Sequence, residues 1–362
     1  MRMMSYKINV ETLQHKKLLI YPPISYPSCH APTICETPSG SLLLAFYAGV
    51  KEGAPDSVVL GAEFKKRKRT WTAPEVWVHV VGRAVANPRL FVGPDQALWL
   101  LVGVNYGTRW CSGDTYLFVK KSWDEGNTWS DLELFCEQKG LLGKNKPFNE
   151  GQLWIIPVEW ERTWSAAFFR SDNNGSSWEL VDDLGRRANA HLIQPAIAKL
   201  SDGRLVAYMR SQEGYVYVTF STDAGKTWST PMPTTIPNNN SGLDVLRTQS
   251  GLLLLACNPV GLMDHPQPVE EGWPDQLAIG FTKWGLRTPL CLLVSQDDGA
   301  TWDMEIVLED GAGEYSYPAL LETSDGMIHI VYTYRRRSIG HIMFAEETLL
   351  KQLKKGGKNV QN

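Results

Sequence analysis

Six short segments of this chain each begin with polar side chains that could take part in chemistry and continue into an apolar stretch. The polar residues are His30, Asn87, Lys146, Gln194, Ser241 with Asp244, and Tyr317. If the fold gathers them, they form a site with a histidine for proton transfer, a tyrosine for nucleophilic attack, and amides and charges for binding. The alternative is that they fill the centre of the fold with hydrogen bonds and do no chemistry.

The apolar stretch in each segment predicts a β-hairpin. The six segments begin at Cys29, Ala86, Asn145, Ile193, Ser241 and Ser316. In each of them a short apolar strand leads through a glycine or aspartate turn into a second apolar strand, as in "SYPALLETSDGMIHIVYTY". Five of the six carry proline near the strand start, where a missing backbone N–H is tolerated. The hairpins recur at intervals of roughly 50 to 75 residues, which indicates a repeat architecture.

A second repeat accompanies the hairpins. The segment "SWDEGNTW" (122–129) recurs as "SDNNGSSW" (171–178), "STDAGKTW" (221–228) and "SQDDGATW" (295–302). The segment "FKKRKRTW", which ends at Trp71, is a degenerate copy of the same repeat. Its aspartate or asparagine can accept hydrogen bonds from turn N–H groups, and its glycine supplies a positive φ. Its tryptophan can pack between neighbouring sheets. We therefore interpret these segments as structural turns and not as sites.

Four strands repeated at this period predict an all-β fold, a six-bladed β-propeller of four-stranded antiparallel blades. We expect one domain over residues 1–350 and a frayed tail over 351–362. Helical periodicity is confined to "EETLLKQLKK" near the C-terminus. The irregular stretch from Asn258 to Gly285 is expected to form a lid or rim loop.

Composition narrows the function classes. A net charge of −3 predicts no nucleic-acid partner, and the basic run Lys65–Arg69 is interpreted as a solvated turn. The N-terminus lacks an apolar core of signal length and no run of 18 apolar residues occurs, so we expect a cytoplasmic protein with no membrane partner. The cysteines are scattered and the histidines show no ligand spacing, so we expect free thiols and neither metal nor cofactor.

The four turns resemble the Asp-boxes of the sialidase superfamily, and the resemblance covers almost the whole chain. In "YPALLETSDG", Tyr317 matches the nucleophilic tyrosine of similar sialidases. Arg210 in "DGRLVAYMRS" and Arg287 in "LRTPLCLLVSQDDG" match two of the three arginines that clamp the substrate carboxylate. Arginine suits that role because its fork meets a carboxylate with two hydrogen bonds. The segments "CHAP", "EGAPD", "SGLD" and "EYSYPA" are most similar to a bacterial sialidase-like branch.

Two residues depart from the family pattern. His30 stands where the first arginine of the triad normally opens the first repeat. Gln194 stands where a glutamate normally assists the tyrosine, and an amide cannot take a proton. A tyrosine nucleophile needs a base or a strong positive field, and Glu314, three residues before Tyr317, is the candidate replacement.

The resemblance also places the catalytic acid and base in the loop after the first repeat. That loop, "GVKEGAPDSVVL", offers Asp56 as the first candidate and Glu52 as the second.

Three functions stay open from the sequence. The first is an exo-acting glycosidase that releases a terminal acidic sugar, sialic acid or a relative, from a short glycoside. Tyr317 would attack the anomeric carbon, a known exception to the usual carboxylate nucleophile. The substrate-binding residues would be Arg210, Arg287, Gln194, Asn87, Lys146 and Asp244. The substrate would be a small molecule or oligosaccharide that carries a carboxylate.

The second function is a uronide lyase or unusual hydrolase in which His30 is the base or acid. The third is a propeller without catalysis that binds glycans or proteins. Aromatic residues on rim loops would then stack on the partner; the candidates are Trp110, Trp160, Trp164, Trp273 and Trp284.

Overall fold

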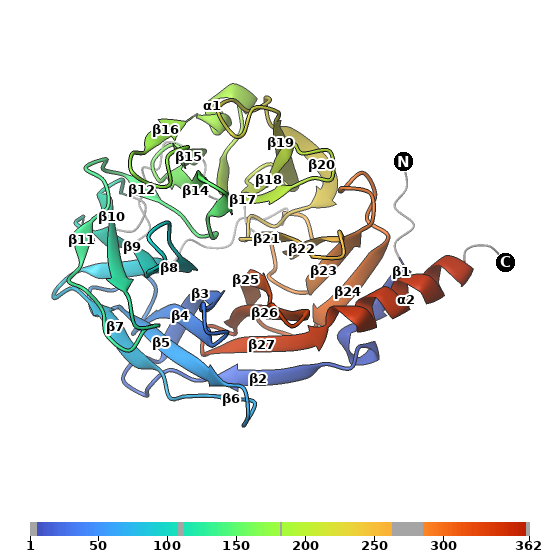
Figure 1. Ribbon diagram of the computed structural model, residues 1–362, viewed down its shortest axis with the longest axis horizontal. Helices are drawn as coiled ribbons and strands as arrows, with labels where there is room; N and C mark the ends of the chain where they lie inside the picture. Colours follow the sequence, from blue (N-terminus) through green and yellow to red (C-terminus); the bar gives the residue numbers. More distant parts are fainter. Residues whose placement is uncertain (1–5, 108–111, 182, 263–284, 360–362) are drawn as a thin grey trace.

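Almost all regular structure in the described part of the chain is β-strand, arranged in sheets around a common centre. The computed structural model describes residues 6–107, 112–181, 183–262 and 285–359, with side chains to residue 355. Viewed down the short axis of the molecule, the sheets radiate from the centre in the manner of a propeller (Figure 1).

The first two sheets are built from hairpins in chain order. One contains β3 (Ser28–Glu36), β4 (Leu42–Gly49), β5 (Val58–Lys65) and β6 (Thr70–Trp71), with β7 (Glu75–His79) also paired to β5. The next contains β8 (Ala84–Val92), β9 (Leu98–Asn105), β10 (Thr115–Ser122) and β11 (Glu133–Leu134). In both, the first strand begins at a predicted hairpin and lies closest to the centre (Figure 1).

The third sheet has nine strands and consists of two hairpin groups. The first group is β12 (Leu141–Leu142), β13 (Phe148–Glu150), β14 (Leu153–Trp160), β15 (Ser165–Ser171) and β16 (Glu179–Val181). The second group is β17 (Leu192–Lys199), β18 (Leu205–Ser211), β19 (Tyr215–Ser221) and β20 (Met232–Pro237). A single parallel pair, Ser165 with Leu192, joins the groups. Hydrogen bonding therefore divides the described strands into five sheets, and the blade count of six stays a prediction.

The last two sheets include strands from the start of the chain. One is β21 (Asp244–Arg247), β22 (Leu253–Cys257), β23 (Leu290–Ser295), β24 (Met304–Glu309) and the parallel strand β1 (Tyr6–Asn9). The other is β25 (Tyr315–Glu322), β26 (Met327–Tyr334), β27 (Ser338–Ala345) and β2 (Lys16–Ile20). The helical segments are η1 (Val10–Thr12), α1 (Leu184–Ala188) and α2 (Glu346–Asn359). The N-terminal strands thus fasten the first residues to the last two sheets (Figure 1).

A bulge recurs at the central end of four inner strands. The pairing register shifts within β3, β8, β17 and β25, each time across a residue that precedes proline. The residues before these prolines have left-handed φ values: 52° at Ala31, 47° at Asn87, 56° at Gln194 and 53° at Tyr317. A bulge bends its strand and re-aims a side chain. The proline positions noted in the sequence therefore mark the places where inner strands change direction.

The Asp turns have the structural role predicted for them. In the first, Asp124 accepts from the Thr128 backbone N–H at 2.8 Å and from its hydroxyl at 2.6 Å, while Gly126 has a φ of 90°. Asp223 and Asp297 make the same contacts in their turns. Because these carboxylates are satisfied by their own turns, they are not available as ligands.

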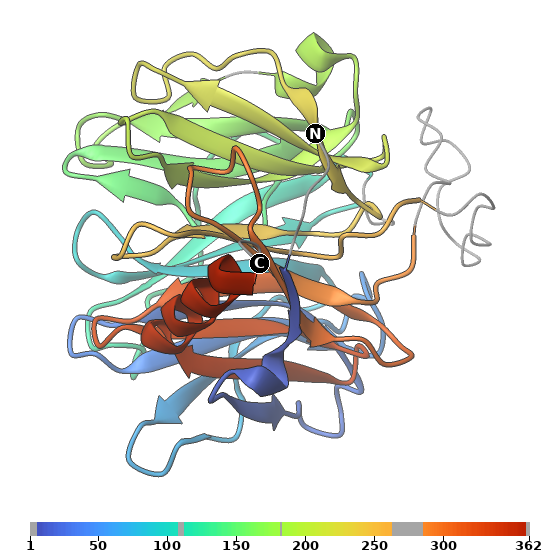
Figure 2. The ribbon, with the colours of Figure 1, turned by 90° about the vertical axis from the view of Figure 1, so that its right-hand side faces the viewer.

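The C-terminal helix is longer and better packed than the sequence indicated. α2 continues to Asn359 and so includes most of the residues expected to be a frayed tail. Its Leu349 and Leu353 are buried in the cluster formed by the last two sheets, because an apolar stripe on one face meets that core. Figure 2 shows α2 on the outside of the molecule.

Two sequence expectations concern thiols and membrane spans. The five described cysteines, Cys29, Cys35, Cys136, Cys257 and Cys291, are free, and Cys111 lies outside the described residues. None of the helices in the described ranges has the length and apolar character of a membrane span.

A buried histidine pair joins the first and last sheets. The Trp71 indole N–H donates to Nδ1 of His341 at 3.0 Å, which leaves the His341 proton on Nε2. That nitrogen lies 2.9 Å from Nδ1 of His329, and the two rings stack. Burial lowers the pKa of His329 to about 4 and the pKa of His341 well below its ordinary value. Both imidazoles are therefore neutral at pH 7.

This pair predicts a loss of stability in acid. The unfolded imidazoles bind protons below about pH 6.5 and the folded pair resists them, so stability falls as the pH drops from there toward 4. The loss is about 3 kcal/mol for a pKa shift of this size. We expect His329→Asn, which keeps an acceptor but cannot protonate, to show a smaller loss between pH 7 and pH 4.5 in urea unfolding. The exposed His79→Asn is the control, and an unchanged loss in His329→Asn would contradict the assignment.

Candidate active site

The hydroxyl of Tyr317 lies at the centre of the polar cluster where the inner strands meet. The bulge of β25 turns this tyrosine, which is 7% exposed, toward residues from other sheets. Nη1 of Arg210, on β18, donates to its hydroxyl oxygen at 2.6 Å. The guanidinium of Arg287, which precedes β23, lies over its ring at 5.4 Å from the centroid. The tyrosine and both arginines singled out in the sequence are thus brought together.

Gln194 supplies a second donor to the same oxygen. It occupies the bulge of β17, and its Oε1 accepts from Nη1 of Arg210 at 3.2 Å. Its Nε2 lies 3.4 Å from the Tyr317 hydroxyl. A reversed amide would set an N–H donor against the guanidinium, so Arg210 fixes which end of the amide faces the tyrosine. Two N–H groups therefore point at one phenol oxygen.

Glu314 lies between two arginines. One carboxylate oxygen accepts from Arg287 at 2.6 Å and the other from Nε of Arg336 at 2.9 Å. Burial alone would raise the pKa of Glu314, but the charges of Arg287 and Arg336 outweigh it and hold that pKa well below its ordinary value. Arg336 also pairs with Glu52 from the loop after β4. Glu314 therefore remains charged and orients the arginines, and its contacts join it to them and not to the tyrosine.

His30 packs against the ring of Tyr317 with centroids 4.1 Å apart. Its Nδ1 lies 2.7 Å from the hydroxyl of Thr333, and that hydroxyl oxygen accepts from the Ala31 N–H. The Thr333 hydroxyl can donate to Nδ1, and in that tautomer the imidazole proton lies on Nε2. Burial first, and then the charge of Arg336, lower the pKa of His30 well below its ordinary value. A neutral imidazole therefore packs against the Tyr317 ring.

Two lysines and an aspartate brace the strand that carries the tyrosine. Lys144 donates to the carbonyls of Leu243 and Pro318, and Lys146 donates to the carbonyl of Leu320. The carboxylate of Asp244 accepts from the Leu320 N–H at 2.8 Å. Lys146 and Asp244, predicted to bind substrate, are thus engaged with backbone groups. This agrees with the alternative in which residues at the centre fill the fold with hydrogen bonds.

The other sequence candidates lie at the edges of this network. Asn87 is buried at the bulge of β8. Asp56 accepts from the Val50 N–H at 3.0 Å within its own loop, and among the described residues its other oxygen has no partner. Ser241 is buried in the segment before β21. Sequence reasoning missed Lys144, Arg336 and Thr333, because only the fold brings them to the centre.

Of the tryptophans proposed for stacking, the two that the structure describes pack against other side chains. Trp160 packs against a core cluster, and Trp164 is 3% exposed beneath the guanidinium of Arg210. Trp110, Trp273 and Trp284 lie outside the described residues, as does most of the predicted rim loop between Asn258 and Gly285.

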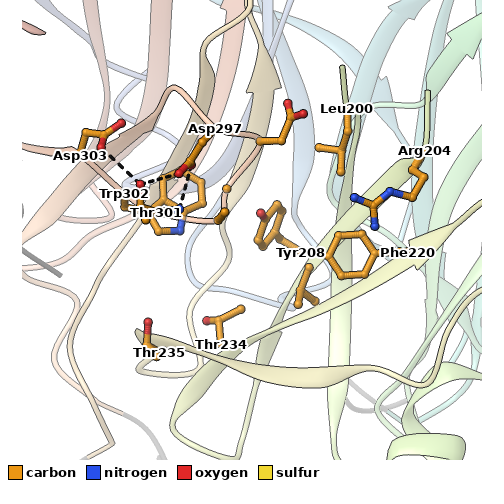
Figure 3. Close-up of a pocket in the computed structure, with 14 residues that line it drawn as sticks. Leu200, Arg204, Tyr208, Phe220, Thr234, Thr235, Asp297, Thr301, Trp302 and Asp303 are labelled. Carbon is orange, nitrogen blue, oxygen red and sulfur yellow. Dashed lines mark hydrogen bonds between the residues drawn. The ribbon is translucent and has the colours of Figure 1, made fainter. Parts of the chain in front are cut away.

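A separate cleft of about 650 Å³ lies between β18–β20 and the Asp turn after β23 (Figure 3). Arg204, Tyr208 and Phe220 line one side and Trp302 the other. Asp297, in its wall, is engaged in the turn with Thr301. The cleft contains none of the residues around Tyr317, so its size does not make it the site of chemistry. Among the described residues, no group of three or more histidine, cysteine, aspartate or glutamate side chains is arranged to hold a metal.

Comparison with known proteins shows the family and the fold to which the chain is similar. The family model of the BNR repeat-like domain matches residues 40–330. An anhydrosialidase from Macrobdella decora is 24% identical over 231 residues, which cover 60% of this chain and 29% of that protein. The chain thus matches less than a third of the length of that relative.

Two solved structures show the likeness of the fold. The intramolecular trans-sialidase from Ruminococcus gnavus has a TM-score of 0.68 at 16% identity, covering 92% of this chain and 98% of that one. The NanB sialidase from Streptococcus pneumoniae has a TM-score of 0.70 at 12% identity, covering 93% and 71%.

The brace under Tyr317 gives a stability prediction. Lys144→Met would remove the donor to two buried carbonyls, and an unsatisfied buried acceptor costs about 1–3 kcal/mol. We expect a loss of that size in the free energy of unfolding measured by urea titration. The control is Lys199→Met, an exposed lysine paired with Glu150, for which we expect a change within about 0.5 kcal/mol. Equal effects in both variants would show that Lys144 is not a brace.

Proposed function

The chain belongs to the BNR repeat-like domain family of the sialidase superfamily, and we propose that it is a glycosidase that hydrolyses a terminal acidic sugar, sialic acid or a relative. The observation that carries the proposal is the Tyr317 hydroxyl, which receives N–H groups from Arg210 and Gln194. Two donors aimed at one oxygen stabilise the negative charge that a phenolate nucleophile must carry. The same proposal takes the nine-stranded sheet as two blades, which makes six in all.

The substrate carboxylate would be held by arginines. Arg210 and Arg287 both lie over the ring of Tyr317, at 5.7 and 5.4 Å from its centroid, and reach it from different sheets. A carboxylate placed there would meet two guanidinium groups and, in the tautomer with the proton on Nε2, an N–H of His30. The two charges supply most of the attraction, and the histidine adds direction without charge.

The reaction would proceed with retention of configuration. The Tyr317 phenolate forms a bond to the anomeric carbon while the bond from that carbon to the leaving oxygen breaks. A carboxylic acid gives its proton to that oxygen, and as carboxylate it then takes a proton from the water that releases the sugar and the phenolate. Asp56 is the better candidate for this acid, because the carboxylate of Glu52 is occupied by Arg336.

The main test combines turnover with trapping. A Trypanosoma rangeli sialidase forms a covalent intermediate with 2,3-difluorosialic acid. We expect this chain to hydrolyse a chromogenic α-sialoside and to gain the mass of one fluorosugar in intact-mass spectrometry. Tyr317→Phe should lose the adduct and reduce turnover by at least about 100-fold. Tyr208→Phe, a tyrosine of the separate cleft, should retain both.

Other outcomes would overturn the proposal. Full turnover or an adduct in Tyr317→Phe would remove the tyrosine from its role. Cleavage of a 4-linked uronide that depends on His30, with a new absorbance from an unsaturated product, would favour the lyase alternative. Neither adduct nor turnover on any substrate would favour a binding module. Analysis of the released sugar would separate hydrolysis from an intramolecular transfer, the activity named for the Ruminococcus gnavus protein.

A further inference from the structure

A buried glutamate that no motif indicated lies behind Gln194. Glu159 is near the end of β14, where it pairs with Leu142 and Ala166, and it is 2% exposed. Its Oε2 has no hydrogen-bond partner among the described residues. Burying a carboxylate without compensation is costly, so its surroundings must supply charge or donors.

The surroundings of Glu159 point toward the tyrosine. The side chain of Gln194 is within hydrogen-bonding reach of its carboxylate. Charged side chains face it from several elements: Arg89 of β8, Arg210 of β18, Lys144 of the segment before β13, and Glu161 just after β14. The carboxylate of Glu159 is therefore a neighbour of the amide that donates to Tyr317.

The hydrogens of the Gln194 amide suit this arrangement. Its oxygen is occupied by Nη1 of Arg210 at 3.2 Å, so both hydrogens of Nε2 are available as donors. One points to the Tyr317 hydroxyl at 3.4 Å, and the carboxylate of Glu159 can accept the other. An amide that donated to both groups could not turn away from the tyrosine.

We infer that Glu159 is a positioning residue which fixes the Gln194 amide as a hydrogen-bond donor to the Tyr317 hydroxyl. The family pattern has a carboxylate at position 194, and here the carboxylate is displaced by one side chain to position 159. A glutamate at 194 would set two carboxylates against each other, which explains why an amide is the compatible residue. The effect of Glu159 on catalysis rests on the proposed function. Its contact with Gln194 does not.

The pair can be tested by exchanging its two members. Glu159→Gln and Gln194→Glu would each spoil the arrangement, whereas the double variant restores one carboxylate and one amide. We expect each single variant to lower kcat about 10-fold or more with little change in KM, and the double variant to exceed both singles. Losses that multiply in the double variant would overturn the inference, as would a gain of activity in Gln194→Glu alone.

The pH profile separates a positioning role from a merely structural one. Burial raises the pKa of Glu159 to about 7, so its carboxylate takes up a proton as the pH falls through that value and then holds the amide less firmly. The wild type should therefore lose kcat/KM on the acid side with a midpoint near pH 7. Glu159→Gln should lack this limb, and an unchanged limb would count against the role.

A second measurement needs no substrate. Melting temperatures at pH 8.5 for the wild type, both single variants and the double variant form a cycle that reports coupling between positions 159 and 194. We expect the effects to be non-additive by a few degrees. The control cycle pairs Gln194→Glu with Glu179→Gln, an exposed residue of β16 paired with Arg170, and should be additive. Additivity at 159 would overturn the premise. Non-additive melting temperatures in a protein that turns over no substrate would support the contact between positions 159 and 194 and would contradict the proposed glycosidase function.

Discussion

The structure depends on a backbone constraint repeated at its centre: a non-glycine residue in a left-handed conformation directly before proline. Tyr317 and Gln194 both occupy such a bulge, with φ values of 53° and 56°. Each position costs about 1–3 kcal/mol and persists only if its surroundings hold it. The surroundings do so, because Lys144 bonds the carbonyl of Pro318 and Asp244 bonds the N–H of Leu320, from other sheets. The same hydrogen bonds therefore hold the centre of the fold together and orient the Tyr317 side chain.

The electrostatics of the site are organised before any substrate arrives. Glu314 joins Arg287 to Arg336, and Arg336 joins Glu52, so ion pairs run from the loop after β4 to the strand beside the tyrosine. Pairs fixed in this way keep the guanidinium groups in position at little further cost in side-chain entropy. The same pairing argues against Glu314 as the base, because its oxygens accept from Arg287 and Arg336, and the groups that contact the phenol oxygen are the N–H donors of Arg210 and Gln194.

The local features of the fold could be predicted from the sequence, and the long-range ones could not. Hairpins and Asp turns depend on neighbouring residues, so their positions followed from turn chemistry. Tyr317, Arg210 and Arg287 could be selected from the sequence, because each matches a motif at a known position of the repeat. The hydrogen bonds of Lys146 and Asp244 to the backbone of Leu320 could not be predicted, because they join segments that are far apart in the sequence. Arg336, the fastening role of β1 and β2, and the helical extension of the tail depend on contacts across the whole chain, which no local pattern encodes.

The two departures from the sialidase pattern compensate each other electrically. A glutamine in place of glutamate removes one negative charge beside Tyr317, and a neutral histidine in place of arginine removes one positive charge. Either change alone would leave a buried charge without its balance, which costs several kcal/mol. Counted over positions 30 and 194 alone, the two changes in charge cancel, and both positions keep a hydrogen-bonding group, Nε2 of Gln194 and the imidazole of His30.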